Sequence, residues 1–165
     1  MKINKESNTQ VGNFSINIIL ANEDDIIHIL EIEQEANSPS WTHGALLSEI
    51  YKEDSFFIVA VDNENIIGFA IMNNTDNCGE ILKIAVDKSW RRKGVGDLLI
   101  RSVLDHAECM KYDSVFLEVR KTNDAAIRLY EKHGFNKVRV RKDYYTHPIE
   151  DAFIMMLEFK EMRRN

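Results

Sequence analysis

The amino-acid sequence predicts an α/β fold in which helices lie on the faces of a mixed β-sheet. Short apolar runs with the period of a strand alternate with amphipathic helical segments, in the order β-α-α-β-β-β-α-β-α-β-β. The 165 residues, 44% hydrophobic and 29% charged, suffice for one globular domain with a substantial core. No repeat or low-complexity tract divides them. We therefore expect a single domain over residues 14–160 after a flexible polar leader over residues 1–13.

The N-terminal half of the chain predicts three strands and two helices. The strands cover residues 15–20, 56–61 and 66–72. Asn22, with Asp25 three residues later, is a typical N-cap for a helix that ends near Ala36. Thr42 is the expected N-cap of the second helix. The polar residues 62–65 predict a hairpin turn between the second and third strands.

The C-terminal half predicts two further helices between strands. The strands cover residues 82–86, 114–119, 136–141 and 153–159, with a loop at residues 144–151. The first helix begins near Gly94 and has an apolar face at helical spacing. The second covers residues 123–133, where Asn123 is a credible N-cap and Gly134 a C-terminal cap.

A basic, glycine-containing turn joins the strand at residues 82–86 to the helix that follows. It reads Arg91-Arg92-Lys93-Gly94-Val95-Gly96. Glycines let the backbone approach a ligand closely, and the unpaired N–H groups of a first helical turn favour an anion. The spacing fits neither the nucleotide P-loop nor the Rossmann fingerprint. The segment therefore indicates either a phosphate site or simply a basic, flexible turn.

Two residues in the C-terminal half are candidates for proton transfer. Glu118 lies on the opposite strand face from Leu117 and Val119, and Tyr130 lies on the helix that follows. A carboxylate and a phenol in one cleft would form a base and acid pair. The residues alone leave a second interpretation open, in which Glu118 is a solvated strand residue and Tyr130 a half-buried core aromatic.

Composition and charge bear on several functional classes. The net charge of −6 argues against nonspecific nucleic-acid binding. Cys78 and Cys109 form neither a disulfide framework nor a metal-ligand pattern, and the five histidines suggest no metal site. No apolar run approaches the roughly 18 residues of a membrane span, and the N-terminus has no signal core. We expect a cytoplasmic protein with no membrane association.

Four motifs together carry a family resemblance. They are Ile84-Ala85-Val86, the basic turn, the block L-E-V-R…L-Y-E-x-x-G-F at residues 117–135, and Tyr144-Tyr145 followed by Glu150-Asp151-Ala152. Over most of residues 15–159 they resemble the RimI-like ribosomal-protein-alanine N-acetyltransferases of the GNAT superfamily. The resemblance implies the GNAT fold, with a splayed mixed sheet, and acetyl transfer from acetyl-CoA. The implied acceptor is the N-terminal alanine of the eighteenth small-subunit ribosomal protein.

The resemblance also implies roles for individual residues. Glu118 would be the proton acceptor, Tyr130 the proton donor, and Asn123 a contact to the cofactor arm. The backbone of Ile84, Ala85 and Val86 would pair with the pantetheine arm. The pyrophosphate cradle would consist of Arg92, Lys93, Gly94, Val95, Gly96 and Asp97. Asp97 departs from the family pattern, because a basic residue is frequent at that position.

The acceptor side is assigned to the segment that follows residue 143. Tyr144, Tyr145, Glu150 and Asp151 would bind the peptide, with the two acids meeting cationic residues after the alanine. The same acids also fit an interpretation as solvated loop residues. Two other functions stay open: a GNAT enzyme for a small amine such as a polyamine or aminoglycoside, and a non-catalytic acetyl-CoA-binding module.

Overall fold

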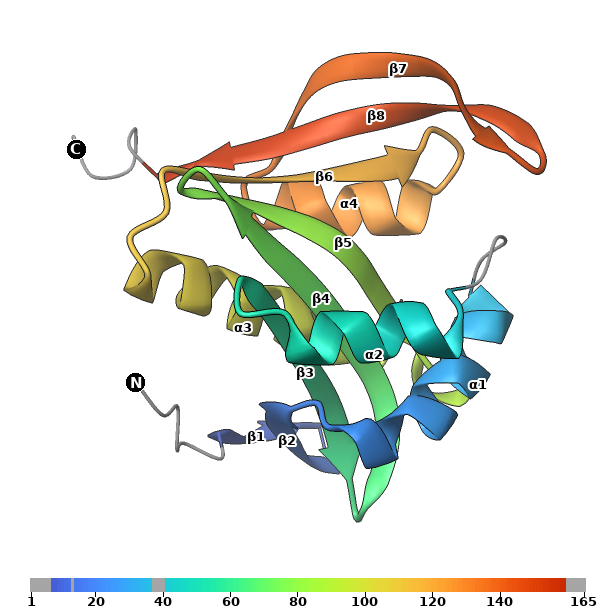
Figure 1. Ribbon diagram of the computed structural model, residues 1–165, viewed down its shortest axis with the longest axis vertical. Helices are drawn as coiled ribbons and strands as arrows, with labels where there is room; N and C mark the ends of the chain where they lie inside the picture. Colours follow the sequence, from blue (N-terminus) through green and yellow to red (C-terminus); the bar gives the residue numbers. More distant parts are fainter. Residues whose placement is uncertain (1–6, 13, 37–40, 160–165) are drawn as a thin grey trace. The chain divides into compact units, whose positions relative to one another are not determined.

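The computed structural model describes residues 7–12, 14–36 and 41–159 (Figure 1). Its strands form a mixed sheet with the order β1-β2-β3-β4-β5-β6-β8-β7, and helices occur between the strands. The predicted α/β fold class is thereby confirmed. The chain divides into two compact units, the first within Met1–Ile71 and Lys83–Leu99, the second within Met72–Leu82 and Ile100–Asn165.

The first unit contains the N-terminal strands and helices. Its elements are β1 (Ser7–Val11), β2 (Phe14–Leu20), the 3-10 helix η1 (Glu23–Asp25), α1 (Ile26–Ala36), α2 (His43–Tyr51), β3 (Ser55–Asp62), the first part of β4 (Asn65–Thr75), the last part of β5 (Cys78–Val86), the 3-10 helix η2 (Lys88–Trp90) and the start of α3 (Val95–Cys109). β2 pairs antiparallel with both β1 and β3. Ile16, Ile29, Leu46 and Phe69 are fully buried in its core.

Both predicted N-caps of the first unit are present. The Asn22 side chain accepts a hydrogen bond from the Asp24 amide, and the Asn22 amide donates to Asp25 Oδ2 at 2.8 Å. The chain passes from η1 directly into α1, which ends at Ala36 as predicted. Thr42 Oγ1 accepts from the Ala45 amide at 3.2 Å. Because each cap satisfies backbone donors that have no partner inside the helix, short-range sequence signals located these helices correctly.

Strand β1 lies within the stretch for which the sequence predicts a flexible leader. Ser7–Val11 pairs residue by residue with β2, from Ser7 opposite Ile18 to Val11 opposite Phe14. The polar composition gives no sign of a strand, but the edge of β2 offers unpaired backbone donors and acceptors. Residues 1–6 and 13 of the leader, and the predicted loop at residues 37–40, lie outside the described residues.

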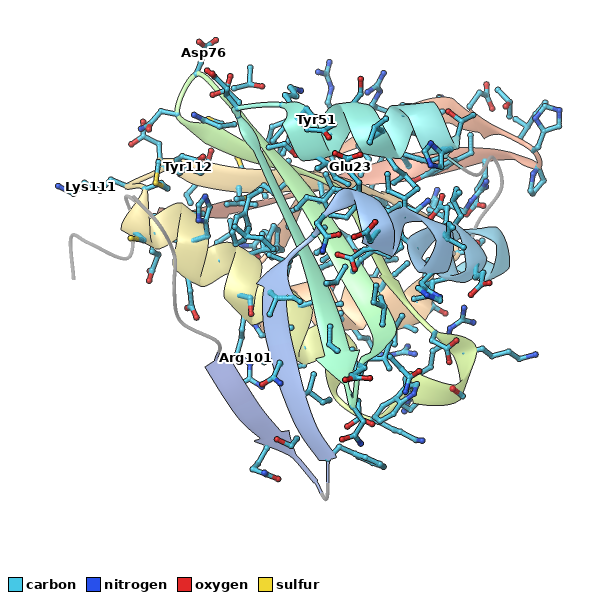
Figure 2. All side chains as sticks on the ribbon, turned by 60° about the horizontal axis from the view of Figure 1, so that its bottom comes forward. Glu23, Tyr51, Asp76, Arg101, Lys111 and Tyr112 are labelled. Carbon is cyan, nitrogen blue, oxygen red and sulfur yellow. The ribbon has the colours of Figure 1, made fainter. Side chains whose placement is uncertain are left out.

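The second unit contains the C-terminal strands and α4. It comprises the end of β4, the start of β5, the rest of α3, β6 (Ser114–Arg120), α4 (Asp124–Lys132), β7 (Asn136–Thr146) and β8 (Ile149–Glu158). β5 pairs parallel with β6 from Cys78 opposite Ser114 to Ile81 opposite Leu117, whereas β8 pairs antiparallel with both β6 and β7. Asp76 projects from the turn between β4 and β5 (Figure 2). The predicted splay of the sheet lies between the strand ends at Val86 and Val119, which belong to different units, and it stays a prediction.

Helix α4 is bounded as the sequence predicts. Asn123 Oδ1 accepts from the Ala126 amide at 3.2 Å, and Gly134 has φ +87° directly after the C-cap. Only glycine adopts this left-handed conformation at little cost, which explains its place there.

The predicted loop at residues 144–151 is wrong. β7 continues to Thr146 and β8 begins at Ile149, so only His147 and Pro148 lie between the two strands. Tyr145 pairs with Glu150, and Thr146 with Ile149. The aromatic and β-branched residues of this stretch favour a strand, but an irregularity in β7 hides the usual alternation. The strand predicted at residues 82–86 also begins earlier, at Cys78.

Candidate active site

The basic turn of the first unit precedes the N-terminus of α3. Arg92 has φ +64° and Gly94 has φ +86°, and the helix begins at Val95. The first intrahelical bond of this turn runs from the Leu98 amide to the Gly94 carbonyl at 3.0 Å. The amides at the start of the helix have no acceptor within it, and a helix N-terminus attracts an anion. The turn therefore has the backbone geometry of a phosphate site.

The side chains of the turn add positive charge around this helix end. Arg92 and Lys93 are exposed, and Arg91 Nε donates to the Val86 carbonyl at 3.2 Å. Lys93 Nζ lies 4.9 Å from the centre of the Trp90 ring and 5.4 Å from that of Phe14. Such cation–π contacts restrain the ammonium group without neutralising it. These residues fit a pyrophosphate. No local sequence pattern indicates that two aromatic rings support Lys93.

The end of β5 directs alternate backbone groups toward β4 and away from it. The Ala85 carbonyl faces β4, because a Cβ atom added at Gly68 would lie only 3.0 Å from it. The Asp87 amide likewise donates to the Ile67 carbonyl of β4 at 3.0 Å. Since successive residues of a strand direct their backbone groups to opposite edges, those of Ile84 and Val86 face away from β4. This arrangement fits the predicted pairing with an extended cofactor arm.

A buried ion pair, unforeseen from the sequence, holds β5 to α1 within the first unit. Lys83 Nζ lies 2.7 Å from Glu33 Oε1, and Glu33 is fully buried. The Trp41 amide also donates to Glu33 Oε1, at 3.3 Å. The pair thus fixes the residue next to the Ile84-Ala85-Val86 segment. Two ions 50 positions apart give no local sequence signal.

In the second unit, two side chains converge on Glu118. This residue lies on β6 between the buried Leu117 and Val119, and 15% of its side chain is exposed. Arg141 Nη1 donates to Glu118 Oε1, and the Tyr144 hydroxyl also forms a hydrogen bond with the Glu118 side chain. The Arg141 guanidinium lies 4.3 Å from the centre of the Tyr144 ring. The structure therefore brings together the predicted residues Glu118 and Tyr144, and adds Arg141.

The electrostatics of this cluster follow from the Glu118 carboxylate. Its hydrogen bond to Tyr144 is the main cause that raises the pKa of Tyr144 to about 12. The hydrogen bond from Arg141 raises the pKa of the guanidinium. Both neighbours are hydrogen-bond donors at neutral pH, so they orient the carboxylate and leave part of its acceptor capacity for a further donor.

The other predicted acceptor-side residues have partners within the chain. Glu150 Oε2 lies 3.0 Å from Arg120 Nη1, while Glu150 Oε1 accepts from the amide and the hydroxyl of Thr122 at 2.8 and 2.7 Å. The Thr122 hydroxyl is the largest cause that lowers the pKa of Glu150. The Arg120 guanidinium lies 4.0 Å from the centre of the Tyr145 ring. These contacts hold the β7–β8 tip to the end of β6.

Tyr130 is more deeply buried than the sequence interpretation of a half-buried core aromatic requires. It is 8% exposed, and its ring centre lies 5.9 Å from that of Phe135. Burial raises the pKa of Tyr130 well above its usual range. The phenol is therefore protonated at any physiological pH, as a proton donor must be. Its role as the acid, like the contact of Asn123 to a cofactor, stays a prediction.

The described residues contain neither a metal-binding cluster nor a membrane-spanning helix. Within residues 7–12, 14–36 and 41–159, no group of three or more His, Cys, Asp or Glu side chains could hold a metal ion. None of the helices in these ranges combines the length and the apolar character needed to cross a membrane.

Comparison with known proteins identifies the family of this chain. Residues 26–135 match the Acetyltransferase (GNAT) family. The ribosomal protein bS18-alanine N-acetyltransferase of Escherichia coli K12 is 34% identical over 135 residues, covering 81% of this chain and 90% of that protein.

Two crystal structures show the same fold. The ribosomal-protein-S18-alanine N-acetyltransferase of Escherichia coli has a TM-score of 0.81 and 32% identity, covering 87% of this chain and 93% of that one. Ard1 of Thermoplasma volcanium has a TM-score of 0.80 and 29% identity, covering 87% and 97%. The chain belongs to the acetyltransferase (GNAT) family, as its motifs predict.

Proposed function

We propose that this protein transfers an acetyl group from acetyl-CoA to the N-terminal alanine of ribosomal protein bS18. Support comes from the Escherichia coli relative, which is named for that reaction and matches over most of both chains. The bS18 N-terminus is the peptide partner under this proposal, with no direct binding to nucleic acid or membrane. The reaction belongs in the cytoplasm, where ribosomal proteins are made.

The first unit would hold the acetyl donor. GNAT acetyltransferases use acetyl-CoA, which when bound supplies an activated acetyl thioester. Arg92, Lys93 and the amides at the start of α3 would bind its pyrophosphate, for the reasons of charge and backbone geometry given above. The outward-facing backbone groups of Ile84 and Val86 would pair with its pantetheine arm.

Glu118 would remove the proton that keeps the acceptor unreactive. An N-terminal ammonium has a pKa of roughly 7.7–8.0, so most of it is protonated and cannot act as a nucleophile at neutral pH. The Glu118 carboxylate, directly or through a water molecule, would accept this proton. Tyr130 would donate a proton to the leaving thiolate, since its buried phenol stays protonated.

The observation that carries this proposal is the oriented carboxylate of Glu118. Most of its side chain is shielded, and Arg141 and Tyr144 both hold it by hydrogen bonds. An ionised carboxylate has about four acceptor positions, so it can receive a substrate donor while both contacts remain.

The direct test is acetylation of a peptide with the N-terminal sequence of bS18. We expect the wild-type protein to acetylate its α-amine, as mass spectrometry would show, and to act poorly on spermidine or free lysine. Glu118→Gln should lower kcat by roughly 10²–10⁴, the usual range for general acid–base catalysis, with little change in acetyl-CoA binding. Raising the pH should partly restore this variant, because more of the amine is then neutral.

Glu158→Gln is the matched control, since Glu158 is an exposed acid on β8 of the same unit. It should behave like the wild type. If the protein acetylates a polyamine efficiently and does not acetylate an alanine-initiated peptide, its substrate would be a small amine. If Glu118→Gln acetylates the peptide at wild-type rates across pH 6–9, Glu118 is not the proton acceptor.

A further inference from the structure

Strand β7 contains a bulge directly after Arg141. Arg141 pairs with Ala152, and the next pair along the ladder is Tyr145 with Glu150. Lys142, Asp143 and Tyr144 therefore stand opposite the single residue Asp151. Extra residues in one strand bend it and change the direction of its side chains.

The bulge explains how Arg141 and Tyr144 can reach the same carboxylate. In a regular strand, residues three positions apart point to opposite faces of the sheet. Here both contact Glu118, and the Arg141 guanidinium lies over the Tyr144 ring. Without the extra residues, only one of the two side chains could lie on the face that carries Glu118.

The Asp151 side chain provides a hydrogen-bond acceptor for a backbone amide of the bulge. Asp143 has φ +51°, a left-handed conformation that Asp tolerates better than most residues. Its amide donates to Asp151 Oδ1 at 3.1 Å, in place of a ladder partner. Asp151 Oδ2 lies 3.7 Å from Lys121 Nζ. The first contact holds the bulge, whereas the second joins two partly exposed charges and contributes little.

We propose that Asp151 is a positioning residue, whose side chain caps the β7 bulge and thereby places Arg141 and Tyr144 on Glu118. This inference rests on the proposed role of Glu118 as the proton acceptor. It differs from the expectation that Asp151 meets a cationic acceptor, since it requires the acceptor oxygen of Asp151 and not its charge.

Three variants separate the two roles. Asp151→Ala removes both the cap and the charge, whereas Asp151→Asn keeps an oxygen that can accept from the Asp143 amide. Lys121→Met removes the cation that faces Asp151 and leaves the cap. We expect Asp151→Ala to lower kcat on the bS18 peptide by on the order of 10- to 100-fold, as small misplacements of catalytic groups do. Asp151→Asn and Lys121→Met should stay within about twofold of wild type, with unchanged peptide KM and salt dependence.

Amide hydrogen exchange at Asp143 supplies a readout that does not depend on activity. Loss of the cap in Asp151→Ala should speed exchange at this amide, while Asp151→Asn keeps it slow. The proposal is overturned if Asp151→Asn loses as much activity as Asp151→Ala, or raises the peptide KM, because charge would then be the requirement. It is also overturned if exchange quickens in Asp151→Ala while kcat is unchanged.

The experiment distinguishes this proposal from the proposed function. If the wild-type protein does not acetylate the peptide, the proposed function fails. The exchange comparison still decides whether Asp151 holds the bulge, and equal exchange in wild type and Asp151→Ala would reject that. Should Asp151→Ala not fold, a fall in kcat for Lys121→Met or Asp151→Asn would overturn the proposal, and wild-type kinetics in both would support it.

Discussion

The basic turn before α3 and the Glu118 cluster are built in opposite ways. The turn uses consecutive residues, and its main donors are backbone amides at a helix end. The cluster joins Glu118 of β6 to Arg141 and Tyr144 of β7, which are more than 20 positions away. A site of the first kind depends on local backbone conformation. A site of the second kind depends on strand register, so a distant substitution can disrupt it.

The buried pair of the first unit gives the largest expected effect and tests whether the basic turn is locally determined. Lys83→Met leaves the Glu33 carboxylate buried without its cation, which should lower the free energy of unfolding by about 3–5 kcal/mol in urea titrations. The double variant Glu33→Leu with Lys83→Met should recover most of this loss. Inorganic pyrophosphate, which has no pantetheine arm, should bind the folded fraction of Lys83→Met as it binds wild type; a weaker affinity there would show that the turn depends on long-range contacts.

Gly94 allows a sharper test of the local geometry of the turn. Gly94→Val places a β-branched residue at φ +86°, a strain of about 1–3 kcal/mol that should weaken coenzyme A binding by roughly 10- to 100-fold in calorimetry. Gly44→Ala is the matched control, because Gly44 lies inside α2, outside the turn, and a Cβ atom added there would meet no atom within 4 Å. Equal, unchanged affinities in both variants would reduce the segment to a simple turn.

A titration of Tyr144 tests the second region. Glu118→Ala removes the hydrogen bond that is the main cause of its raised pKa, so the value should fall from about 12 toward 10. In the wild type the neutral phenol is favoured on folding, so this stabilisation is present below about pH 10 and is lost as the pH rises toward 12. Nuclear magnetic resonance of the tyrosine ring would follow the change, with Tyr144→Phe to assign the signal. A wild-type Tyr144 that ionises near pH 10 would show that the hydrogen bond to Glu118 is absent.

The smallest effect concerns Glu150, which fastens the β7–β8 tip. The pKa of this carboxyl is lowered in the folded protein, mainly by Thr122, so its contribution to stability is present above about pH 4.5. It is lost as the pH falls through the lower folded value. Glu150→Gln should therefore reduce the melting temperature slightly at pH 7, and its difference from wild type should shrink as the pH falls below about 4.5. If Glu150→Gln instead raises the peptide KM and weakens the salt dependence of this KM, the result would support the predicted role of Glu150 in binding the peptide substrate.

Local signals in the sequence determined much of this protein. The N-caps at Asn22, Thr42 and Asn123, and the C-terminal cap at Gly134, lie where the sequence predicts them. The alternation around Glu118 correctly places its side chain on the face opposite Leu117 and Val119. Each of these features depends on the conformation of a few neighbouring residues, which the sequence reports directly.

Tertiary structure alone decided which side chains meet. No local pattern indicates that Arg141 binds Glu118, that Lys83 pairs with Glu33, or that Asp151 caps Asp143. The bulge in β7 interrupts the alternation of that strand, which is why residues 144–151 suggest a loop. The physical reason is that strand register and a bulge arise from pairing between distant segments, and a change of one residue in register moves every following side chain to the other face.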